Sequence, residues 1–305
     1  MSRPMANLLL LLAGAIWGMG FVAQSTAMDA IGPFLFIGLR FLVASFVVAP
    51  LAIREMRSAT APLSRSSRRG FVAIGATLFA GMGLQQVGLL STSVTNSGFL
   101  TGLYVIFTPV ISLLVLRLRP HVLVWPAVLT TFAGIWLLAG GQAEPLNHGD
   151  YLTIACAVLW AVQLILIGRF ASQSNRPYAL SLSQFAITAC LGLAVASVSE
   201  PLDPAAIAAA LPEILFAGVF ASGIAFTLQV VAQRYTSAPQ AAIFLSTESL
   251  FAALFAALVL GETILPLGYL GGLLIFLAIL LVEVGPTLMR RKPSVPGIEP
   301  HDRPA

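Results

Sequence analysis

Ten apolar segments, each long enough to cross a lipid bilayer as a helix, determine what this chain can fold into. A membrane-spanning helix needs roughly 20 predominantly apolar residues. The segments are 7–27, 34–53, 71–90, 95–116, 122–140, 150–170, 178–198, 213–233, 239–260 and 266–285. The connections between them are too short to build an extramembrane domain. The sequence therefore predicts an all-α integral membrane protein with ten transmembrane helices, whose function resides within the bilayer.

Composition excludes the soluble classes of protein. Of the 305 residues, 58% are hydrophobic and 9% are charged, whereas soluble domains carry about 25% charged residues. A soluble enzyme, a nucleic-acid binder and a disordered protein are therefore excluded. The two cysteines, Cys156 and Cys190, lie inside apolar segments, which is typical of small buried hydrophobes. We predict no disulfide, no metal site and no cofactor.

The charged residues predict how the helices are oriented. Cationic residues accumulate on the cytoplasmic side of membrane proteins. With the N-terminus inside, ten alternating helices put 15 of the 16 Lys and Arg residues in cytoplasmic segments, and the sixteenth, Arg40, lies within the second helix. The outer segments contain acidic residues but no Lys or Arg. We therefore expect a multi-pass protein of a bacterial inner membrane with both termini in the cytoplasm.

The two halves of the chain resemble each other at an offset of 143 to 145 residues. The offset relates Trp17 to Trp160 and Gln85 to Gln229. Other matches are Pro33-Phe34 with Pro177-Tyr178, Arg40-Phe41 with Gln184-Phe185, Thr92-Ser93 with Thr236-Ser237, and Phe99-Leu100 with Phe244-Leu245. The matches predict a five-helix repeat at 1–148 and a second one at 149–288, followed by a disordered cytoplasmic tail at 289–305.

The number of helices in each repeat has a mechanical consequence. Because five is odd, the second repeat must cross the membrane in the opposite sense to the first. Inverted repeats produce a pseudo-two-fold axis in the membrane plane and a binding site near the midplane between the halves. This architecture favours a secondary transporter that works by alternating access. Inverted repeats also occur in channels and in some membrane enzymes, which remain as alternatives.

Several residues carry a resemblance to a known family. Trp17, the run Thr-Asn-Ser-Gly-Phe-Leu-Thr at 95–101, Pro109 and the segment 241–248 resemble the EamA family of the drug/metabolite transporter superfamily. The resemblance implies an exporter of amino acids or other small metabolites, with a central cavity walled by helices 1–4 and 6–9. Helices 5 and 10 are peripheral in that family. Where the family usually has a proline after the acidic residue of helix 9, this chain has Ser249, so no proline kink is expected there.

Polar and aromatic residues within the predicted helices supply candidates for the substrate site, because polar groups inside a membrane tend to face the interior of the helix bundle. They form a hydroxyl stripe on helix 4, an amide pair on helices 3 and 8, and mid-helix tryptophans with amides on the same faces. The predicted substrate-binding residues are Trp17, Gln24, Gln85, Gln86, Thr101, Tyr104, Thr108, Trp160, Gln163, Gln229 and Glu248. The alternative is structural, because hydroxyls can bond to their own helix, amides can clamp helices together and aromatics can pack in a core.

Arg40 and Glu248 are the two charges that fall deep within predicted helices. An isolated charge at the bilayer centre costs at least ~2.5–3.5 kcal/mol. The two residues could pair with each other, or Arg40 could bind a substrate carboxylate while Glu248 binds an amine or a proton. For Arg40 we slightly favour a third interpretation, in which its side chain snorkels to the outer interface. Glu248 is the proton-coupling candidate.

The leading functional prediction is a secondary transporter that exports small polar or amphipathic metabolites, most of all amino acids. An intramembrane enzyme is the alternative class, and a carrier of another metabolite or of a drug is the alternative within the same class. An enzyme would need catalytic residues at membrane depth, yet His121, His148 and His301 lie in loops or in the tail. We therefore predict no catalytic residue, a small-molecule substrate, the lipid bilayer as surroundings and no nucleic-acid partner.

Overall fold

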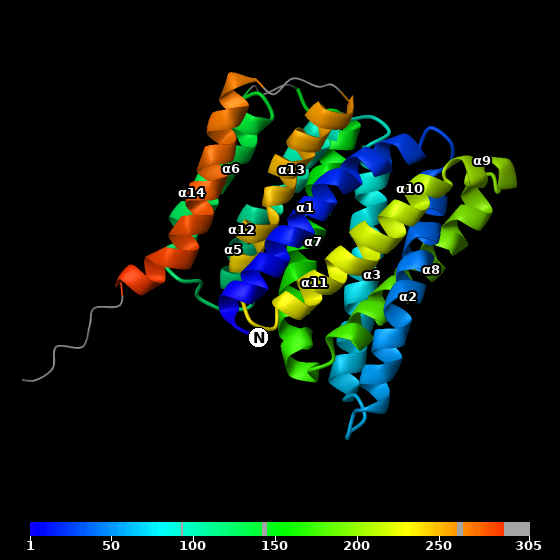
Figure 1. The fold of residues 1–305 in the computed structure, drawn as a ribbon, viewed down its shortest axis with the longest axis horizontal. Helices are drawn as coiled ribbons and strands as arrows, with labels where there is room; N and C mark the ends of the chain where they lie inside the picture. Colours follow the sequence, from blue (N-terminus) through cyan, green and yellow to red (C-terminus); the bar gives the residue numbers. More distant parts are fainter. Residues whose placement is uncertain (93, 142–144, 261–264, 290–305) are drawn as a thin grey trace, which may run out of the picture.

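The computed structural model describes residues 1–92, 94–141, 145–260 and 265–289, and it is helical throughout (Figure 1). Nine helical stretches of the described residues are long and apolar enough to cross a membrane, and a shorter apolar helix, Val124–Leu138, accompanies them. Together they correspond to the ten segments expected from the sequence. The predicted tail falls outside the described residues except for its first residue, Met289.

Seven of the ten spans each consist of a single helix, which is short in the fifth span, and the other three spans are divided. The undivided spans are α1 (Arg3–Ala27), α2 (Pro33–Arg57), α3 (Arg65–Gly88), α6 (Val124–Leu138), α7 (His148–Ser174), α8 (Pro177–Ser199) and α14 (Pro266–Met289). The fourth span comprises α4 (Val94–Thr101) and α5 (Tyr104–Leu114). The eighth comprises α10 (Leu211–Phe216), the π-helix η1 (Ala217–Ile224) and α11 (Ala225–Ala232), after the short α9 (Pro204–Ala209). The ninth comprises α12 (Ala238–Leu245), α13 (Thr247–Phe255) and the π-helix η2 (Ala256–Leu260).

Local sequence explains where the helices begin. Proline occupies the first turn of α2 and of α8, where its missing N–H costs no hydrogen bond. Asn147 caps α7 by accepting a hydrogen bond from the Asp150 amide, and the Asp150 side chain bonds back to the Asn147 amide. This reciprocal arrangement satisfies two backbone donors at once. Asn175 ends α7 in the left-handed conformation, with a φ of 54°.

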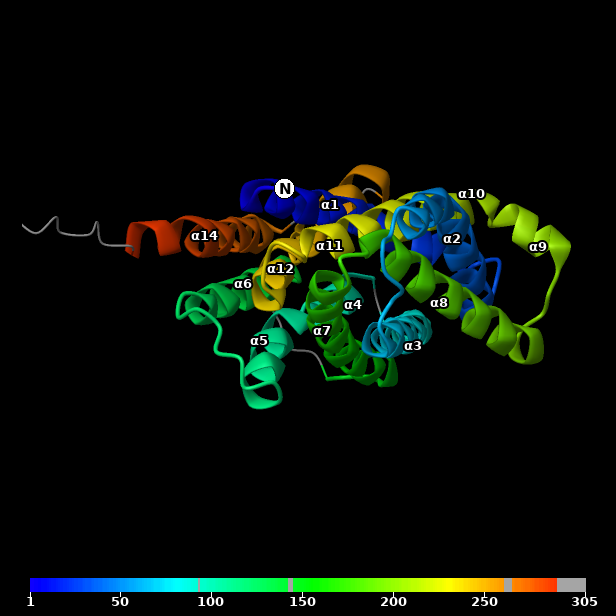
Figure 2. The same cartoon turned by 90° about the horizontal axis from the view of Figure 1, so that it is seen from below.

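The helices form two layers when viewed from below (Figure 2). One layer contains α14, α1, α10 to α11 and α2, and the other contains α6, α5, α7, α3 and α8. Each layer therefore mixes helices of both repeats. Equivalent helices of the two repeats face each other across the layers, as α2 does with α8 and α6 with α14.

Glycine contacts repeat with the same offset as the sequence. A Cβ at Gly75 would lie 2.9 Å from Ile187, and one at Gly218 would lie 2.6 Å from Val43. Gly75 and Gly218 are 143 residues apart, and Val43 and Ile187 are 144 apart. The contact of α3 with α8 is thus the counterpart of the contact of η1 with α2, as a duplicated fold requires.

The ninth span is interrupted although it lacks the family's proline. α12 ends at Leu245 and α13 begins at Thr247. Ser246 and Thr247 donate side-chain hydrogen bonds to the carbonyls of Ile243 and Phe244, at 2.7 and 2.8 Å. Such bonds from hydroxyls to the preceding turn bend helices. The fourth span is interrupted at nearly the repeat-equivalent position, between Thr101 and Tyr104.

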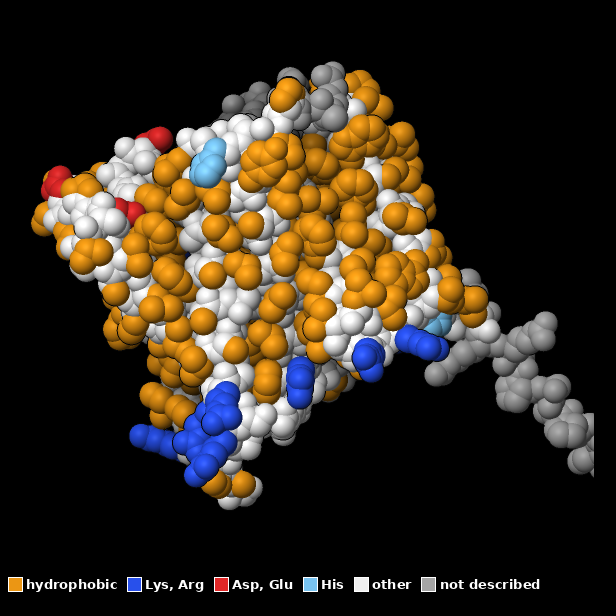
Figure 3. All heavy atoms as spheres, turned by 180° about the vertical axis from the view of Figure 1, so that it is seen from behind, with side chains coloured by type: hydrophobic (Ala, Val, Ile, Leu, Met, Phe, Trp, Pro, Cys, Tyr) orange, Lys and Arg blue, Asp and Glu red, His pale blue; other side chains and the backbone are white. Residues whose placement is uncertain are grey.

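Charge is distributed unevenly over the surface. Figure 3 shows the Lys and Arg side chains along one edge of the molecule and the acidic side chains near the opposite edge. We call the first edge the arginine-rich face. It is the face where α2 and α7 end, where α3 begins and where Arg3, Arg119, Arg169 and Arg234 gather.

Candidate functional site

A cavity lies in the middle of the helix bundle, between both repeats. It leaves about 50 Å³ for the centres of water molecules, which is room for roughly three to five waters. Its lining residues come from α1, α2, α3, both halves of the fourth span, α7, η1, α11, α12 and α13. They are Trp17, Gly20, Phe21, Gln24, Arg40, Met82, Gln85, Thr101, Tyr104, Trp160, Leu164, Ala221, Phe226, Gln229, Leu245 and Glu248.

An aromatic cluster forms one wall of this cavity. The ring of Phe226 lies 4.7 Å from that of Trp17 and 5.7 Å from that of Trp160, measured between centroids. Trp17 also donates a hydrogen bond from Nε1 to the carbonyl of Ala221, at 2.8 Å. That carbonyl is available because the π-helix pairs the amide of Ala225 with Phe220, five residues back, where an α-helix would use Ala221.

The apolar wall is nearly symmetric between the two repeats. Trp17 and Trp160 are 143 residues apart, Phe21 and Leu164 are also 143 apart, and Met82 and Phe226 are 144 apart. The offset of the repeats therefore pairs lining residues that differ in chemical detail but share position. The charged groups break this symmetry, because the residue equivalent to Arg40 is Gln184.

Arg40 marks one end of the cavity. Its side chain is 2% exposed, and it donates hydrogen bonds from Nε to Ser222 at 2.9 Å and from Nη1 to Gln24 at 3.0 Å. The guanidinium also lies 5.2 Å from the centre of the Phe41 ring. Arg40 therefore does not snorkel to the interface, because partners from α1 and η1 hold it inside. It also forms no ion pair with Glu248 or with another acidic side chain among the described residues.

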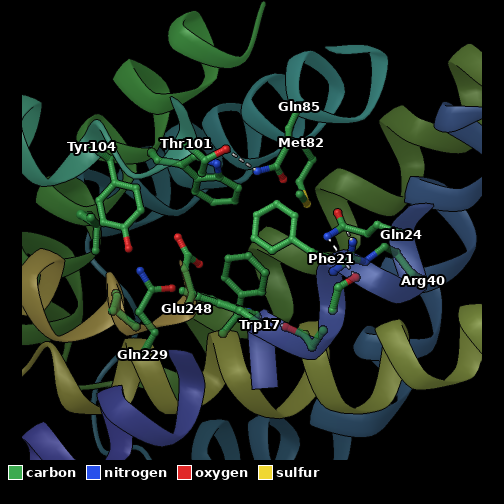
Figure 4. A pocket seen from close by; sticks show the side chains of 16 residues that line it. Trp17, Phe21, Gln24, Arg40, Met82, Gln85, Thr101, Tyr104, Gln229 and Glu248 are labelled. Atoms are coloured by element: carbon green, nitrogen blue, oxygen red, sulfur yellow. Dashed lines mark hydrogen bonds between the residues drawn. The ribbon is translucent and has the colours of Figure 1, made fainter. Parts of the chain in front are cut away.

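Glu248 marks the other end, as Figure 4 shows. It lies in the first turn of α13 and is 5% exposed. The hydroxyl of Tyr104 and the amide of Gln229 point toward the same space (Figure 4). Oε1 of Glu248 and Oε1 of Gln229 are buried without a hydrogen-bond partner, and the Tyr104 hydroxyl lies close to the carboxyl outside hydrogen-bonding geometry. Buried polar groups are normally paired, so this group of atoms is suited to a ligand.

Two predicted amides support the walls between these ends. Gln85 donates a hydrogen bond from Nε2 to the Thr101 hydroxyl at 3.0 Å, which joins α3 to α4. Gln24 accepts from Arg40 through Oε1 and donates from Nε2 to the carbonyl of Gly20, at 3.2 Å. Both amides line the cavity, and their bonds fix the direction in which their remaining atoms face.

Three of the predicted substrate-binding residues do not line the cavity. Gln86 is buried and donates to the carbonyl of Gln24 at 3.4 Å, which clamps α3 to α1. Gln163 donates to the Gln184 side chain at 3.3 Å and joins α7 to α8. Thr108 donates to the carbonyl of Tyr104 at 2.7 Å within its own helix. Each of these bonds is of the structural kind that was the alternative at the sequence level.

The sequence analysis missed several lining residues, among them Phe21, Met82, Leu164 and Phe226. All four are apolar, and apolar residues give no signal within an apolar helix. The repeat offset could have found them, because it relates Phe21 to Leu164 and Met82 to Phe226. Phe226 also lies three residues before Gln229, on the same face of α11.

The part of the chain that the structure describes contains no group of three or more His, Cys, Asp or Glu side chains placed to hold a metal ion. Cys156 is a buried free thiol and Cys190 an exposed one.

Comparison with known proteins assigns this architecture to a family. The model of the EamA-like transporter family matches the chain twice, at residues 4–140 and 147–284. An uncharacterized transporter of Archaeoglobus fulgidus is 32% identical over 287 residues, which cover 93% of this chain and 87% of that protein. A protein of known crystal structure shares the fold, with a TM-score of 0.79 and 17% identity over 95% of this chain and 100% of that chain. The chain is a membrane transporter and not an enzyme, and it belongs to the EamA-like transporter family.

Proposed function

We propose that this transporter exports small zwitterionic metabolites, with amino acids as the leading class, and that the central cavity is its substrate site. The observation that carries the proposal is the separation of two buried charges. Arg40 and Glu248 line one cavity without pairing with each other. A free amino acid carries a carboxylate and an ammonium group, which complement the two ends.

The energetic argument starts from the cost of buried charges. An isolated ionised side chain inside the membrane costs at least ~2.5–3.5 kcal/mol. The hydrogen-bond partners of Arg40 are uncharged and do not neutralise its positive charge, and Glu248 has an oxygen without a partner. A zwitterion would offset both costs at once, because charge-assisted hydrogen bonds are about twice as strong as neutral ones.

The remaining wall favours an amphipathic substrate. Trp17, Trp160 and Phe226 offer aromatic surface between the two charged ends. Ligand sites are typically apolar with a few polar groups that fix orientation. The side chain of an amino acid would rest against this surface.

Transport requires the cavity to widen, because in this state it has room for only a few waters. We propose that residues 1–148 and 149–288 act as two inverted units. Inverted repeats can exchange conformations and so open a midplane site to one side at a time. The helix pairs formed by spans three and four, and by spans eight and nine, would rock around the site.

Charge placement supports an orientation for this cycle. The arginine-rich face would lie in the cytoplasm, because Lys and Arg accumulate there in membrane proteins. Both ends of the chain would then be cytoplasmic, in a bacterial inner membrane. Export is proposed from the resemblance to exporters of amino acids and metabolites.

We further propose that Glu248 couples transport to protons. Its carboxyl lines the central cavity and has an oxygen without a hydrogen-bond partner. The substrate amine and a proton would then compete for the same oxygens, so that binding one releases the other. This competition is the basis of proton antiport.

Counterflow in proteoliposomes tests the proposed function. Vesicles are loaded with an unlabelled amino acid mixture, and entry of labelled amino acids is followed for wild type, Glu248→Gln and Trp17→Ala. We expect saturable entry with wild type and a clear loss in both variants. Absence of entry for every amino acid, from protein shown to be folded, would redirect the substrate search to other metabolites and drugs.

A further inference from the structure

A second, larger cavity opens at the arginine-rich face. It leaves about 900 Å³ for the centres of water molecules and lies between the ends of α5, α7 and α11 and the start of α12. Arg3, Arg119, Arg169 and Arg234 line it together with His121, and none of its lining residues is acidic. We call this cavity the arginine cleft.

The partners of these arginines leave most of their charge uncompensated. Arg3 bonds to the Gln240 side chain, and Arg234 bonds to the Asn175 side chain. Arg169 lies 5.5 Å from the centre of the Phe170 ring. All of these partners are neutral.

Two acidic side chains lie near the arginine cleft but do not line it. Glu55 interacts electrostatically with Arg234, and its oxygens accept hydrogen bonds from the backbone at the start of α8. Glu283 bonds to Asn7 and to Gln240. Arg119 and Arg169 are therefore the cations that contribute most to the positive electrostatic potential of the cleft.

A thin layer separates the arginine cleft from the central cavity. Leu164 lines the central cavity, and the next residue, Ile165, lines the cleft. Gln233, also in the cleft wall, donates from Nε2 to the carbonyl of Leu164 at 2.9 Å. Its Oε1 is buried without a partner. The bond from Gln233 to Leu164 therefore joins α7 to the end of α11 at a point that lies between the two cavities.

We propose that the arginine cleft is the capture site for the substrate carboxylate on the cytoplasmic side, with Arg119 and Arg169 as the anion-binding groups and Gln233 Oε1 as an acceptor for the amine. This inference rests on the proposed function. Clefts lined by charge of one sign raise the local concentration of the opposite ion and speed its arrival by about 10-fold or more. The anionic headgroups of lipids share this chemistry, so the experiment must separate the two sources.

The first measurement reports the electrostatic potential inside the cleft and does not depend on transport. Ser172 lines the cleft, and Ser172→Cys is placed in a Cys156→Ala and Cys190→Ala background. The rates of modification by an anionic and a cationic methanethiosulfonate of similar size are compared in detergent. Adding Arg119→Gln and Arg169→Gln to the Ser172→Cys variant should lower the ratio of the anionic to the cationic modification rate about three- to tenfold. Combination with Arg54→Gln and Arg57→Gln, at the same face but outside the cleft, should leave the ratio unchanged.

The second measurement reads capture of the substrate itself. Initial uptake at low amino acid concentration is measured in inside-out vesicles, which present the arginine-rich face to the added substrate. Arg119→Gln with Arg169→Gln should reduce the rate about three- to tenfold at low ionic strength, and high salt should remove the difference because it screens charge. Uptake of the corresponding amine, which lacks a carboxylate, should not fall.

Each contrary result has a distinct meaning. A rate ratio that does not respond to loss of the two arginines overturns the capture site. A transport defect that occurs only in vesicles with anionic lipids, and not in phosphatidylcholine, overturns it in favour of a lipid headgroup site. A third outcome is that the modification-rate ratio falls with loss of the two arginines as expected, but the protein with all its arginines moves no amino acid. That outcome overturns the proposed substrate, and the carboxylate capture role with it.

Discussion

Glu55 and Glu200 cap each other's helices at opposite ends of the α2–α8 pair. Glu200, which follows α8, accepts hydrogen bonds from the amides of Phe34 and Leu35 at 2.9 and 2.7 Å. Glu55, near the end of α2, accepts from the amides of Tyr178 and Ala179 at 3.4 and 2.8 Å. Carboxylates at helix N-termini are favourable because they satisfy free amides and complement the helix dipole. The two glutamates are 145 residues apart, so the inverted repeat supplies one cap to each end.

The first prediction concerns the strength of these caps. Glu55→Ala and Glu200→Ala should each destabilise the protein by about 1 kcal/mol, which corresponds to a fall of about 2–4 °C in the melting temperature in detergent. Asp29→Ala is the control, because Asp29 is an exposed carboxylate in the connection between α1 and α2. Equal melting temperatures for the cap variants and the control would show that the caps contribute nothing.

The second prediction uses the close contact of α1 with α13. A Cβ at Gly18 would lie 2.6 Å from the backbone nitrogen of Ala252, whereas nothing lies within 4 Å of one at Gly98. Gly18→Ala should therefore destabilise the protein by about 1–3 kcal/mol. Gly98→Ala should be neutral or stabilising by up to about 1 kcal/mol. Thermal melting of both variants in the same detergent checks the contrast, and a tolerated Gly18→Ala would mean that the two helices are not packed as described.

The third prediction separates the ring of Trp17 from its hydrogen bond. Trp17→Phe keeps an aromatic wall against Phe226 but loses the bond to the Ala221 carbonyl. This bond joins α1 to η1 and does not involve substrate, so its loss should cost about 0.5–1.5 kcal/mol of stability and leave most of the counterflow activity. Trp17→Ala, which also removes the wall, should be clearly worse. A Phe variant as impaired as the Ala variant would assign the whole effect to the bond.

The fourth prediction concerns proton coupling. An imposed pH gradient should drive amino acid accumulation by wild type. In Glu248→Gln, which cannot exchange a proton, whatever counterflow remains should no longer respond to the gradient. Tyr104→Phe, which leaves the carboxyl in place, should still respond. Residual flux of the Gln variant that follows the gradient as in wild type would place coupling elsewhere.

Much of this fold could be predicted from the sequence because its signals are periodic and strong. The apolar segments and the repeat offset indicated ten helices in two related halves, and the offset already paired Trp17 with Trp160 and Gln85 with Gln229. The sequence indicated no proline kink at Ser249, and the interruption at Ser246 has a different cause, the hydroxyls that bond to the preceding turn.

The placement of side chains was harder to predict, because it depends on partners that are distant in sequence. Arg40 lies near the start of α2, a position that predicts snorkelling, but Ser222 and Gln24 hold it inside. Gln163 faces Gln184 rather than the cavity. Residues of the same type, such as Gln85 and Gln86, differ in role because adjacent positions on a helix point in different directions.

The central claim, a zwitterion held between Arg40 and Glu248, is tested most directly by competition in counterflow. Labelled amino acid enters against an excess of its unlabelled form, of the amine that lacks its carboxylate, or of the acid that lacks its amine. We expect only the intact amino acid to compete well with wild type, with each analogue weaker by about tenfold or more, because each loses a charge-assisted hydrogen bond of about 1.5–3 kcal/mol. Arg40→Gln should lose discrimination against the amine, and Glu248→Gln against the acid. Equal competition by all three compounds in wild type would contradict the claim.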